Sequence, residues 1–499
     1  MRPADAYADL TARFRRHALV GEAAAMLHWD WAAMMPAGGA ARRTEQLAEL
    51  ELLSHEMMAD PVLGDLLETA EGAGLDGWEA ANLRAMRRRW VHATALPADL
   101  VEALATSTAE CEMVWRDARE AGDYAAFAAA FEPVLGQVRD KAAALGEALG
   151  CEAYDALIDQ FDPGARQAEV DPLFDELQEF LPGILDAVLA RQAVEPAPDA
   201  GPLALEETAQ AALAHETMAT LGFDFAHGRL DTSHHPFCGG VSQDVRITTR
   251  YDMADLSTGL MGVLHETGHA LYERGLPGDW RDQPVGEACG MAVHESQSLL
   301  FEMQACRSLA FFRYLAPQIR DAVGAPEGAQ GYGAEALHRR AIHVSPGLIR
   351  VDADEVTYPF HIFLRYDLEK SLVAGDLAVS DLPDAWDEGM QRWLGLVPAH
   401  PRDGVMQDIH WPTGTIGYFP SYTVGAVMAA QLFEAAIRDL ADLPEQLEAG
   451  NFAPLLAWLR EAIHAQGSRL SRAELVVAAT GAPLGTEAFH SHLKRRYLG

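Results

Sequence analysis

The segment VLHETGHALYERGLP, residues 263–277, limits the fold most strongly, because its His-Glu-x-x-His pattern is meaningful only on a helix. On a helix, residues four apart lie on one face, so His265 and His269 could reach one metal ion. Glu266 lies on the same turn and could hold a metal-bound water without being a ligand. A pair of buried, hydrogen-bonded histidines is the alternative interpretation of this pattern.

The flanking residues predict where this helix begins and ends. Asp255 precedes apolar residues at helical spacing and can act as the N-cap. At the other end, Arg274 places a cation in the last turn and Gly275 is expected to adopt the left-handed conformation. Pro277 cannot continue the helix. We therefore expect a helix that starts after Asp255 and stops before Pro277.

A catalytic zinc needs a third protein ligand and an open position for water. Glu295 lies 26 residues after His269 (295 − 269), which leaves room for a turn and an antiparallel return helix. Glu295 faces along that helix with Ser298 and Glu302. His294 is expected to point elsewhere, so we choose Glu295 as the ligand. The alternative for Glu295 is a solvated helix position.

Charge and composition exclude several classes of partner. The formal net charge is −36, from 74 acidic and 38 basic residues, which argues against binding nucleic acid or an anionic membrane. The five cysteines show no C-x-x-C spacing, so no disulfide framework or cysteine metal site is expected. The N-terminus lacks a signal-peptide pattern and no stretch reaches transmembrane length, which favours a cytoplasmic protein.

Most of the chain is predicted to be helical, in one large domain spanning 1–499. The longest linker-like stretch is short, at 193–202, so no firm domain boundary is visible. Ala, Leu, Glu and Arg dominate, as is typical of helices. Apolar residues recur at helical spacing in five segments outside the metal region: 79–93, 124–149, 173–191, 425–441 and 453–465.

The segment 227–251 is the exception and predicts a small β-ribbon before the metal helix. Val245, Ile247 and Thr249 alternate with polar residues, and a Cys-Gly-Gly sequence supplies turn residues. Extended peptides commonly bind by adding a strand to a sheet edge. We expect the strand that leads into the metal helix to offer such an edge.

Six motifs occur in order along the chain and together resemble the carboxypeptidase Taq family of metallocarboxypeptidases. An N-terminal segment at 28–50 also resembles the opening of that family, so the resemblance covers essentially the whole chain. The six motifs are HPF at 235–237, DVRIT at 244–248, HETGH at 265–269, HESQ at 294–297, IRVDAD at 349–354 and GVMQDIHW at 404–411.

The resemblance implies a mainly helical fold with a small β-ribbon or sheet next to the active site. It further implies a deep substrate groove, as in angiotensin-converting-enzyme and neurolysin-like peptidases, and a homodimer. Within this fold, residues 1–60 are expected to form a helical lid over the groove, and 255–305 a zinc-binding helix pair. The implied reaction removes single residues from the C-termini of short peptides, with broad specificity and poor action next to proline.

The resemblance also assigns the metal site. His265, His269 and Glu295 would bind one Zn²⁺ per chain, and Glu266 would be the catalytic carboxylate. Zinc would lower the pKa of its bound water to about 7, and Glu266 would take that proton. Co²⁺ or Mn²⁺ suits similar ligands and is an alternative to zinc.

A carboxypeptidase must also bind the terminal carboxylate of its substrate, and the planar guanidinium of arginine does this best. Arg350 is our first choice, with His235 assisting, because in the family their motifs line the substrate side of the groove. The alternative for Arg350 is an ion pair with Asp352 or Asp354. Arg246 either binds substrate or holds the β-ribbon.

The oxyanion of the reaction needs a hydrogen-bond donor besides the metal. The candidates are His410 and either Tyr418 or Tyr422, by resemblance to the His and Tyr that follow the metal helices in related peptidases. The alternative for the tyrosines is a place in the hydrophobic core.

Two rival functions use the same metal residues. One is a zinc endopeptidase or aminopeptidase, and the other is a non-enzymatic helical metal-binding protein. An aminopeptidase would need acidic residues to hold an α-amine, whereas Arg350 and His235 favour a carboxylate. We therefore expect peptide substrates with a free C-terminus.

Overall fold

The structure is a computed structural model that describes residues 1–195, 201–233 and 235–499. Residues 196–200 of the linker-like stretch lie outside the described part. The chain divides into two compact units. The first unit comprises Met1–Ala93, Ala197–Ala341 and Gly425–Leu484, and the second comprises Thr94–Pro196, Ile342–Val424 and Gly485–Gly499. The prediction of one domain over 1–499 stays a prediction.

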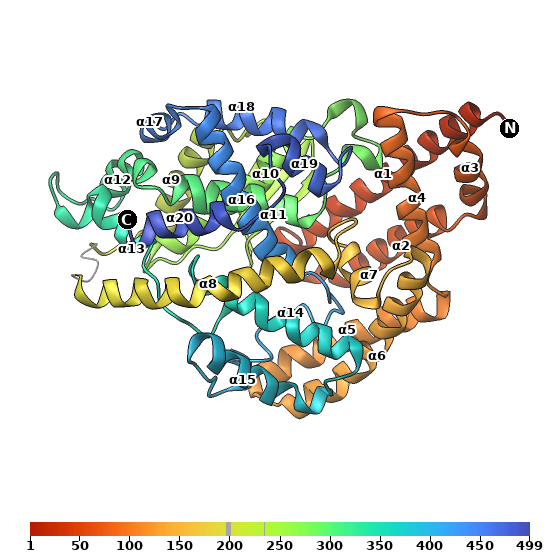
Figure 1. Cartoon of the computed structure of the whole chain (residues 1–499), viewed down its shortest axis with the longest axis horizontal. Coiled ribbons are helices and arrows are strands. Elements are labelled where there is room, and N and C mark those ends of the chain that lie inside the picture. The colour runs from red at the N-terminus through yellow and green to blue at the C-terminus, as the bar shows by residue number, and fades with distance from the viewer. Residues whose placement is uncertain (196–200, 234) are drawn as a thin grey trace. The chain divides into compact units, whose positions relative to one another are not determined.

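Helices make up most of both units, and a small sheet lies in the first (Figure 1). This confirms the predicted fold class. The elements of the first unit are α1(Pro3–Ala33), η1(Ala37–Gly39), α2(Ala40–Met58), α3(Pro61–Glu71), α4(Gly77–Thr94), α9(Glu207–Leu221), β1(Gly228–Thr232), β2(Phe237–Val241), β3(Asp244–Thr249), α10(Leu256–Gly275), η2(Gly278–Trp280), η3(Pro284–Gly286), α11(Met291–Leu299), the π-helical η4(Leu300–Cys306), α12(Leu309–Ala322), η5(Gln330–Tyr332), α13(Ala334–Ala341), α17(Leu443–Glu448), α18(Ala453–Ala462), η9(His464–Gln466) and α19(Arg472–Thr480).

All the regular secondary-structure elements in the described part of the second unit are helices. Helix α16(Pro420–Asp439) begins in the second unit and continues into the first. The other elements of the second unit are α5(Ala98–Ala121), α6(Tyr124–Leu149), α7(Ala153–Asp159), α8(Gln167–Val194), η6(Arg350–Asp352), α14(Tyr358–Ala374), η7(Val379–Asp381), α15(Leu382–Leu394), η8(Pro401–Asp403) and α20(Glu487–Tyr497).

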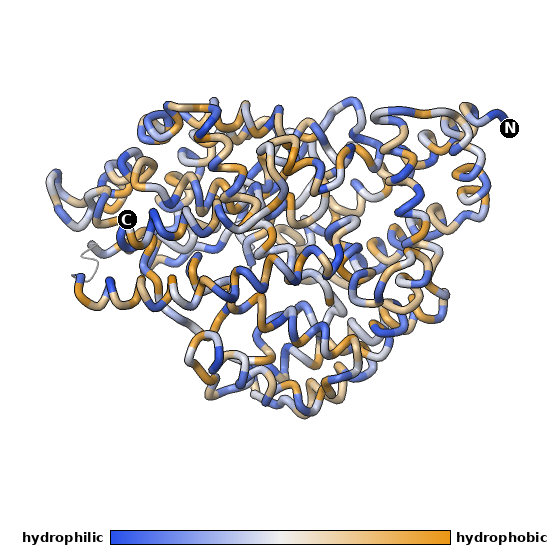
Figure 2. The backbone as a smooth tube through the Cα atoms, viewed as in Figure 1, coloured by the Kyte–Doolittle hydropathy of each residue, from blue (hydrophilic) through white to orange (hydrophobic). Residues whose placement is uncertain are grey.

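The five helical segments expected from apolar spacing are all present, as α4, α6, α8, α16 and α18. Hydrophobic and hydrophilic residues alternate along the helices, as the tube in Figure 2 shows. This amphipathic pattern lets each helix bury one side and expose the other. Among the described residues, none of the helices combines the length and apolar character needed to cross a bilayer.

The sheet has the strand order β1-β3-β2, with β3 parallel to β1 and antiparallel to β2. Val245, Ile247 and Thr249 of β3 are all buried, as their alternation predicts. Val245 and Ile247 share a core cluster with Val263 and Ala270 of α10, so the sheet packs directly on the metal helix. Our expectation about the edge was wrong, because β3 pairs on both sides and only β1 and β2 are edge strands.

Candidate metal centre and substrate-binding residues

Helix α10 begins after Asp255 and stops before Pro277, as predicted, but the conformation of its last residue differs from our expectation. Asp255 caps it by accepting a hydrogen bond from the backbone N–H of Ser257 at 3.0 Å. Gly275 is the last helical residue and has no positive φ, so the left-handed prediction was wrong. The residue before Pro277 is extended, as proline requires, which ends the helix without a left-handed residue. Glycine is needed at 275 because a Cβ there would lie 2.3 Å from Nδ1 of His464.

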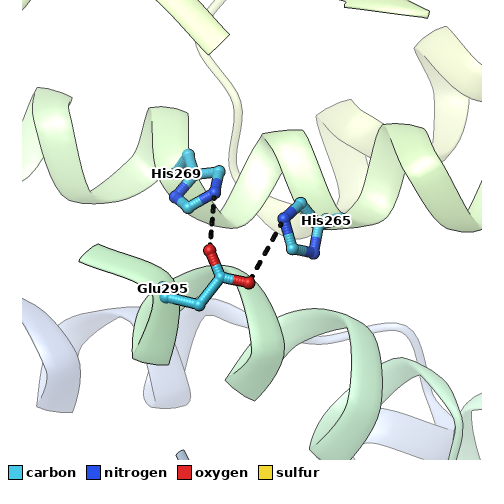
Figure 3. A group of neighbouring side chains, drawn as sticks. All are labelled: His265, His269 and Glu295. Atoms are coloured by element: carbon cyan, nitrogen blue, oxygen red, sulfur yellow. Dashed lines mark ion pairs between the residues drawn. The ribbon is translucent and has the colours of Figure 1, made fainter. Parts of the chain in front are cut away.

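The predicted ligands lie together in the first unit. His265 and His269 come from one face of α10, and Glu295 comes from α11 (Figure 3). The carboxylate oxygens of Glu295 lie 3.9 Å from Nε2 of His265 and 3.6 Å from Nε2 of His269. One ligand atom from each residue falls within 4.8 Å of the others, and no other such group of three occurs among the described residues.

This donor set fits a divalent metal. Two imidazole nitrogens and one carboxylate are the ligands of many catalytic zinc sites. Metal–ligand bonds of about 2.0–2.2 Å in a tetrahedron place neighbouring donors roughly 3.4 Å apart. The separations here are slightly wider, so small side-chain movements would close the three residues on an ion.

Close packing of α10 and α11 brings the ligands together. The helices run antiparallel, since Glu273 contacts His294 while His265, two turns earlier, contacts Glu302. Gly268 permits this approach, because a Cβ there would lie 2.6 Å from the backbone of α11. A second glycine, Gly425 on α16, leaves room for the side chain of Glu295.

Glu266 is buried beside the ligands and has a strongly perturbed pKa. Burial, with a smaller contribution from the charge of Glu295, raises the pKa of Glu266 to about 7, although His265 opposes the shift. A carboxylate whose pKa lies near neutrality can both accept and return a proton at physiological pH. Glu266 therefore has the properties of a general base next to the metal ligands.

Glu302 contacts His265 at Nδ1, the ring nitrogen that does not face Glu295. This nitrogen lies 2.9 Å from Glu302, whose other oxygen accepts a hydrogen bond from Arg307 at 2.7 Å. Glu302 lies in the π-helical η4, and π-helical segments frequently occur at functional sites. Burial alone would lower the pKa of His265, but Glu295, Glu302 and Glu266 together raise it to about 10. These carboxylates favour a cation at this position.

His294 does not point away from the site, contrary to our prediction. Its Nδ1 lies 2.6 Å from Nδ1 of His269, and its Nε2 lies 2.9 Å from Glu273. The close approach of α11 to α10 places both His294 and Glu295 on the α10 side. His294 contacts His269 there, and Glu295 faces both His265 and His269. Burial and the neighbouring His294 and His265 lower the pKa of His269.

In the second unit, Arg350 is buried and forms an ion pair, but its partner differs from the two we considered. Its Nε and Nη2 both donate to Asp408, at 3.0 and 2.8 Å, rather than to Asp352 or Asp354. Its Nη1 donates to the hydroxyl of Tyr358 at 3.0 Å. Asp408 is 58 residues away in the sequence, so local spacing could not reveal this pair.

Asp408 also pairs with a second buried arginine. Nε of Arg365, a residue with no exposed surface, lies 2.7 Å from Asp408. The two guanidinium groups hold the pKa of Asp408 far below its usual range. His361 is also fully buried, and burial next to the arginines lowers the pKa of His361 to about 3. Asp408 thus pairs with two guanidinium groups, those of Arg350 and Arg365. The two positive charges exceed its one negative charge, so the group can attract an anion.

The structure brings together the three oxyanion candidates and Arg350 in the second unit. The hydroxyl of Tyr422 lies 3.4 Å from Nε2 of His410, and the rings of Tyr418 and Tyr422 are 5.1 Å apart. The guanidinium of Arg350 lies 5.1 Å from the ring of Tyr422. Burial and the charge of Arg350 lower the pKa of His410 to about 4. Neither tyrosine is fully buried, so each retains a partly accessible hydroxyl-bearing ring.

The remaining two predicted residues lie in or near the sheet of the first unit. His235 is exposed in the loop between β1 and β2. Arg246 on β3 pairs with Asp244 through two hydrogen bonds, at 3.0 and 2.6 Å, and stacks on Trp29. These contacts match the structural alternative for Arg246, and its role toward a substrate stays a prediction.

The structure adds residues that sequence reasoning missed. Glu273 lies one helical turn after His269, so its spacing could have revealed it. Asp408 lies within the GVMQDIHW motif, two residues before His410. Arg365 and His361 carry no comparable signal, because only the tertiary packing of α14 brings them to Asp408.

A family model described as carboxypeptidase Taq (M32) metallopeptidase matches residues 9–497. The chain belongs to this family. Thermostable carboxypeptidase 1 of Thermus thermophilus is 39% identical over 513 residues, covering 100% of this chain and 99% of that protein. Its namesake in Pyrococcus furiosus is 34% identical, covering 98% of both chains. The solved structure of metallocarboxypeptidase 1 from Trypanosoma cruzi has a TM-score of 0.95 and 36% identity, covering 99% of this chain and 100% of that chain.

Membership of the M32 family confirms the resemblance and assigns the type of reaction. The chain is a metallocarboxypeptidase, a hydrolase that depends on a divalent metal. The cluster of His265, His269 and Glu295 is the one group among the described residues with metal-ligand geometry. This cluster is therefore the candidate metal site of the first unit.

Proposed function

We propose that this M32 enzyme uses zinc to release single amino acids from the C-termini of short peptides, with broad specificity and poor action next to proline. The observation that carries the proposal is the cluster of His265, His269 and Glu295 with the buried Glu266 beside it. Bound zinc would supply Lewis acidity to the scissile carbonyl and to a water molecule. Carboxypeptidase family membership favours this function over an aminopeptidase or a non-enzymatic metal-binding protein.

In this proposal each residue of the site has a separate role in the reaction. Glu266 takes a proton from the attacking water and returns it to the leaving amine, because its pKa of about 7 suits both steps. His410, with Tyr418 or Tyr422, donates a hydrogen bond to the developing oxyanion. Arg350 binds the terminal carboxylate of the peptide.

The hydrogen bonds of Arg350 support its assignment. A guanidinium group carries five N–H groups. Asp408 and Tyr358 use three of them, so two remain for another acceptor. Arg365 competes for Asp408, which leaves the cluster with more positive than negative charge and ready to accept a substrate carboxylate.

We expect Arg350→Ala to lose most of the preference for a free C-terminus. Removing a buried charged partner of the substrate carboxylate should cost about 2–5 kcal/mol of binding. The measurement compares wild type and variant on one peptide with a free C-terminus and on the same peptide amidated. The variant should lose activity on the free acid alone, with metal content unchanged. If a metal-loaded variant keeps the wild-type ratio of activity on the free acid to activity on the amide, Arg350 does not bind the substrate carboxylate.

We also expect short peptides to be good substrates and folded proteins poor ones, because we propose that residues 1–60 form a lid over the groove. Helices α1 and α2 account for most of that segment. The test measures release of amino acids from a short peptide and from an intact globular protein that ends in the same residues. A denatured sample of the same protein controls for its C-terminal sequence. Equal rates on the peptide and the folded protein would contradict the lid.

A further inference from the structure

The two histidine ligands are supported in different ways. Nδ1 of His265 contacts a carboxylate directly, that of Glu302. Nδ1 of His269 instead contacts another imidazole, that of His294, at 2.6 Å. The far nitrogen of His294 then lies 2.9 Å from Glu273. Each ligand is therefore connected to a carboxylate, one directly and one through an intervening histidine.

The positions of the hydrogens in this chain of contacts follow from the metal-facing atom. Nε2 of His269 faces Glu295 and is the nitrogen available to a metal. A ring that binds metal through Nε2 carries its hydrogen on Nδ1, which must donate to the lone pair on Nδ1 of His294. The hydrogen of His294 is then on Nε2 and donates to Glu273. All contacts are satisfied by this one arrangement.

We propose that Glu273 is a positioning residue that acts through His294 to fix the tautomer and ring orientation of His269, and so raises metal affinity. The proposal rests on the metal site proposed above. Side chains behind metal-binding histidines commonly change metal affinity by about 10- to 100-fold. Here the carboxylate is one histidine further away, so its effect must pass through His294.

The dependence on His294 separates this role from that of a nearby negative charge. A charge would attract the metal whether or not His294 were present. A hydrogen-bonded relay loses its effect when the middle residue is removed. A double-mutant cycle measures this difference directly.

The experiment measures zinc affinity by competition with a chromophoric chelator for wild type, Glu273→Ala, His294→Leu and the double variant. We expect each single variant to lose about 10- to 100-fold in affinity. The double variant should bind zinc no more weakly than His294→Leu. The visible spectrum of the Co²⁺-loaded protein should shift in the variants, which a purely structural role would not cause. His294→Asn, whose carbonyl can accept from His269, should bind more tightly than His294→Leu.

Two controls make the outcome decisive. Asp279→Asn removes an exposed negative charge from the segment that follows α10 and should leave zinc affinity unchanged. Thermal unfolding of the metal-free variants shows whether each one folds. If His294→Leu does not fold, His294→Asn takes its place in the comparison. Additive losses in the cycle, or single variants within twofold of wild type, would overturn the relay alone. A wild-type protein that takes up no zinc would overturn the proposed function as well.

Discussion

Replacing Glu266 with glutamine should reduce kcat by at least about 10²- to 10⁴-fold while the protein keeps its metal. The amide has nearly the same size and shape but cannot accept a proton from water or return it to the leaving amine. Glu266 lies beside the ligand cluster without belonging to it, so metal binding should survive. Steady-state kinetics on a short peptide, together with elemental analysis of the same sample, measure both quantities.

The metal content makes this variant informative. A metal-free Glu266→Gln protein would mean that Glu266 is a ligand rather than a base. Activity within tenfold of wild type in a variant with its full metal content would mean that Glu266 is not the general base. Either result would leave the fold and the family assignment untouched.

Glu295→Ala should have the second large effect, the loss of the metal itself. The two carboxylate oxygens of Glu295 face both His265 and His269. Without Glu295, two imidazoles remain, and two ligands hold a divalent ion far more weakly than three. Dialysis against a low concentration of zinc, followed by elemental analysis, should find a mostly metal-free variant.

The matched control is Glu335→Ala, which removes an exposed carboxylate from α13 in the same unit. This control should retain stoichiometric zinc and full activity. A Glu295→Ala protein that stays fully loaded under the same conditions would place the third ligand elsewhere.

The clustering of His265, His269 and Glu295 could be predicted from the sequence because its signals are local or nearly so. The spacing of His265 and His269 requires one helix face, and apolar periodicity predicts the helix around them. Glu295 could be chosen because a return helix of ordinary length places it opposite the pair. The alternation in β3 likewise predicts the burial of Val245, Ile247 and Thr249, although Thr248 between them is buried as well.

Features that depend on tertiary packing could not be predicted in the same way. Gly275 follows the pattern of a left-handed helix end, but its small size serves the approach of His464, nearly 190 residues later. The spacing of His294 says nothing about how tightly α11 packs on α10, and that packing turns His294 toward His269. Strand order is also a tertiary property, so β3 could not be recognised as the central strand.

The partner of Arg350 shows the same limit. Asp352 and Asp354 are close to Arg350 in the sequence, whereas α14 and α15 separate Asp408 from Arg350 along the chain. Family motifs could suggest that Arg350 and the GVMQDIHW segment matter. They could not show that Asp408 joins Arg350 to Arg365.

The most direct test of the central claim is a peptide ladder read by mass spectrometry. Metal-free protein, zinc-reconstituted protein and zinc-treated His265→Ala/His269→Ala protein are each incubated with a short peptide. The account predicts successive loss of single residues from the C-terminus with the reconstituted protein alone, and an intact peptide in the other two samples. Internal fragments, loss from the N-terminus, or the same ladder from the protein without its two histidines would contradict it.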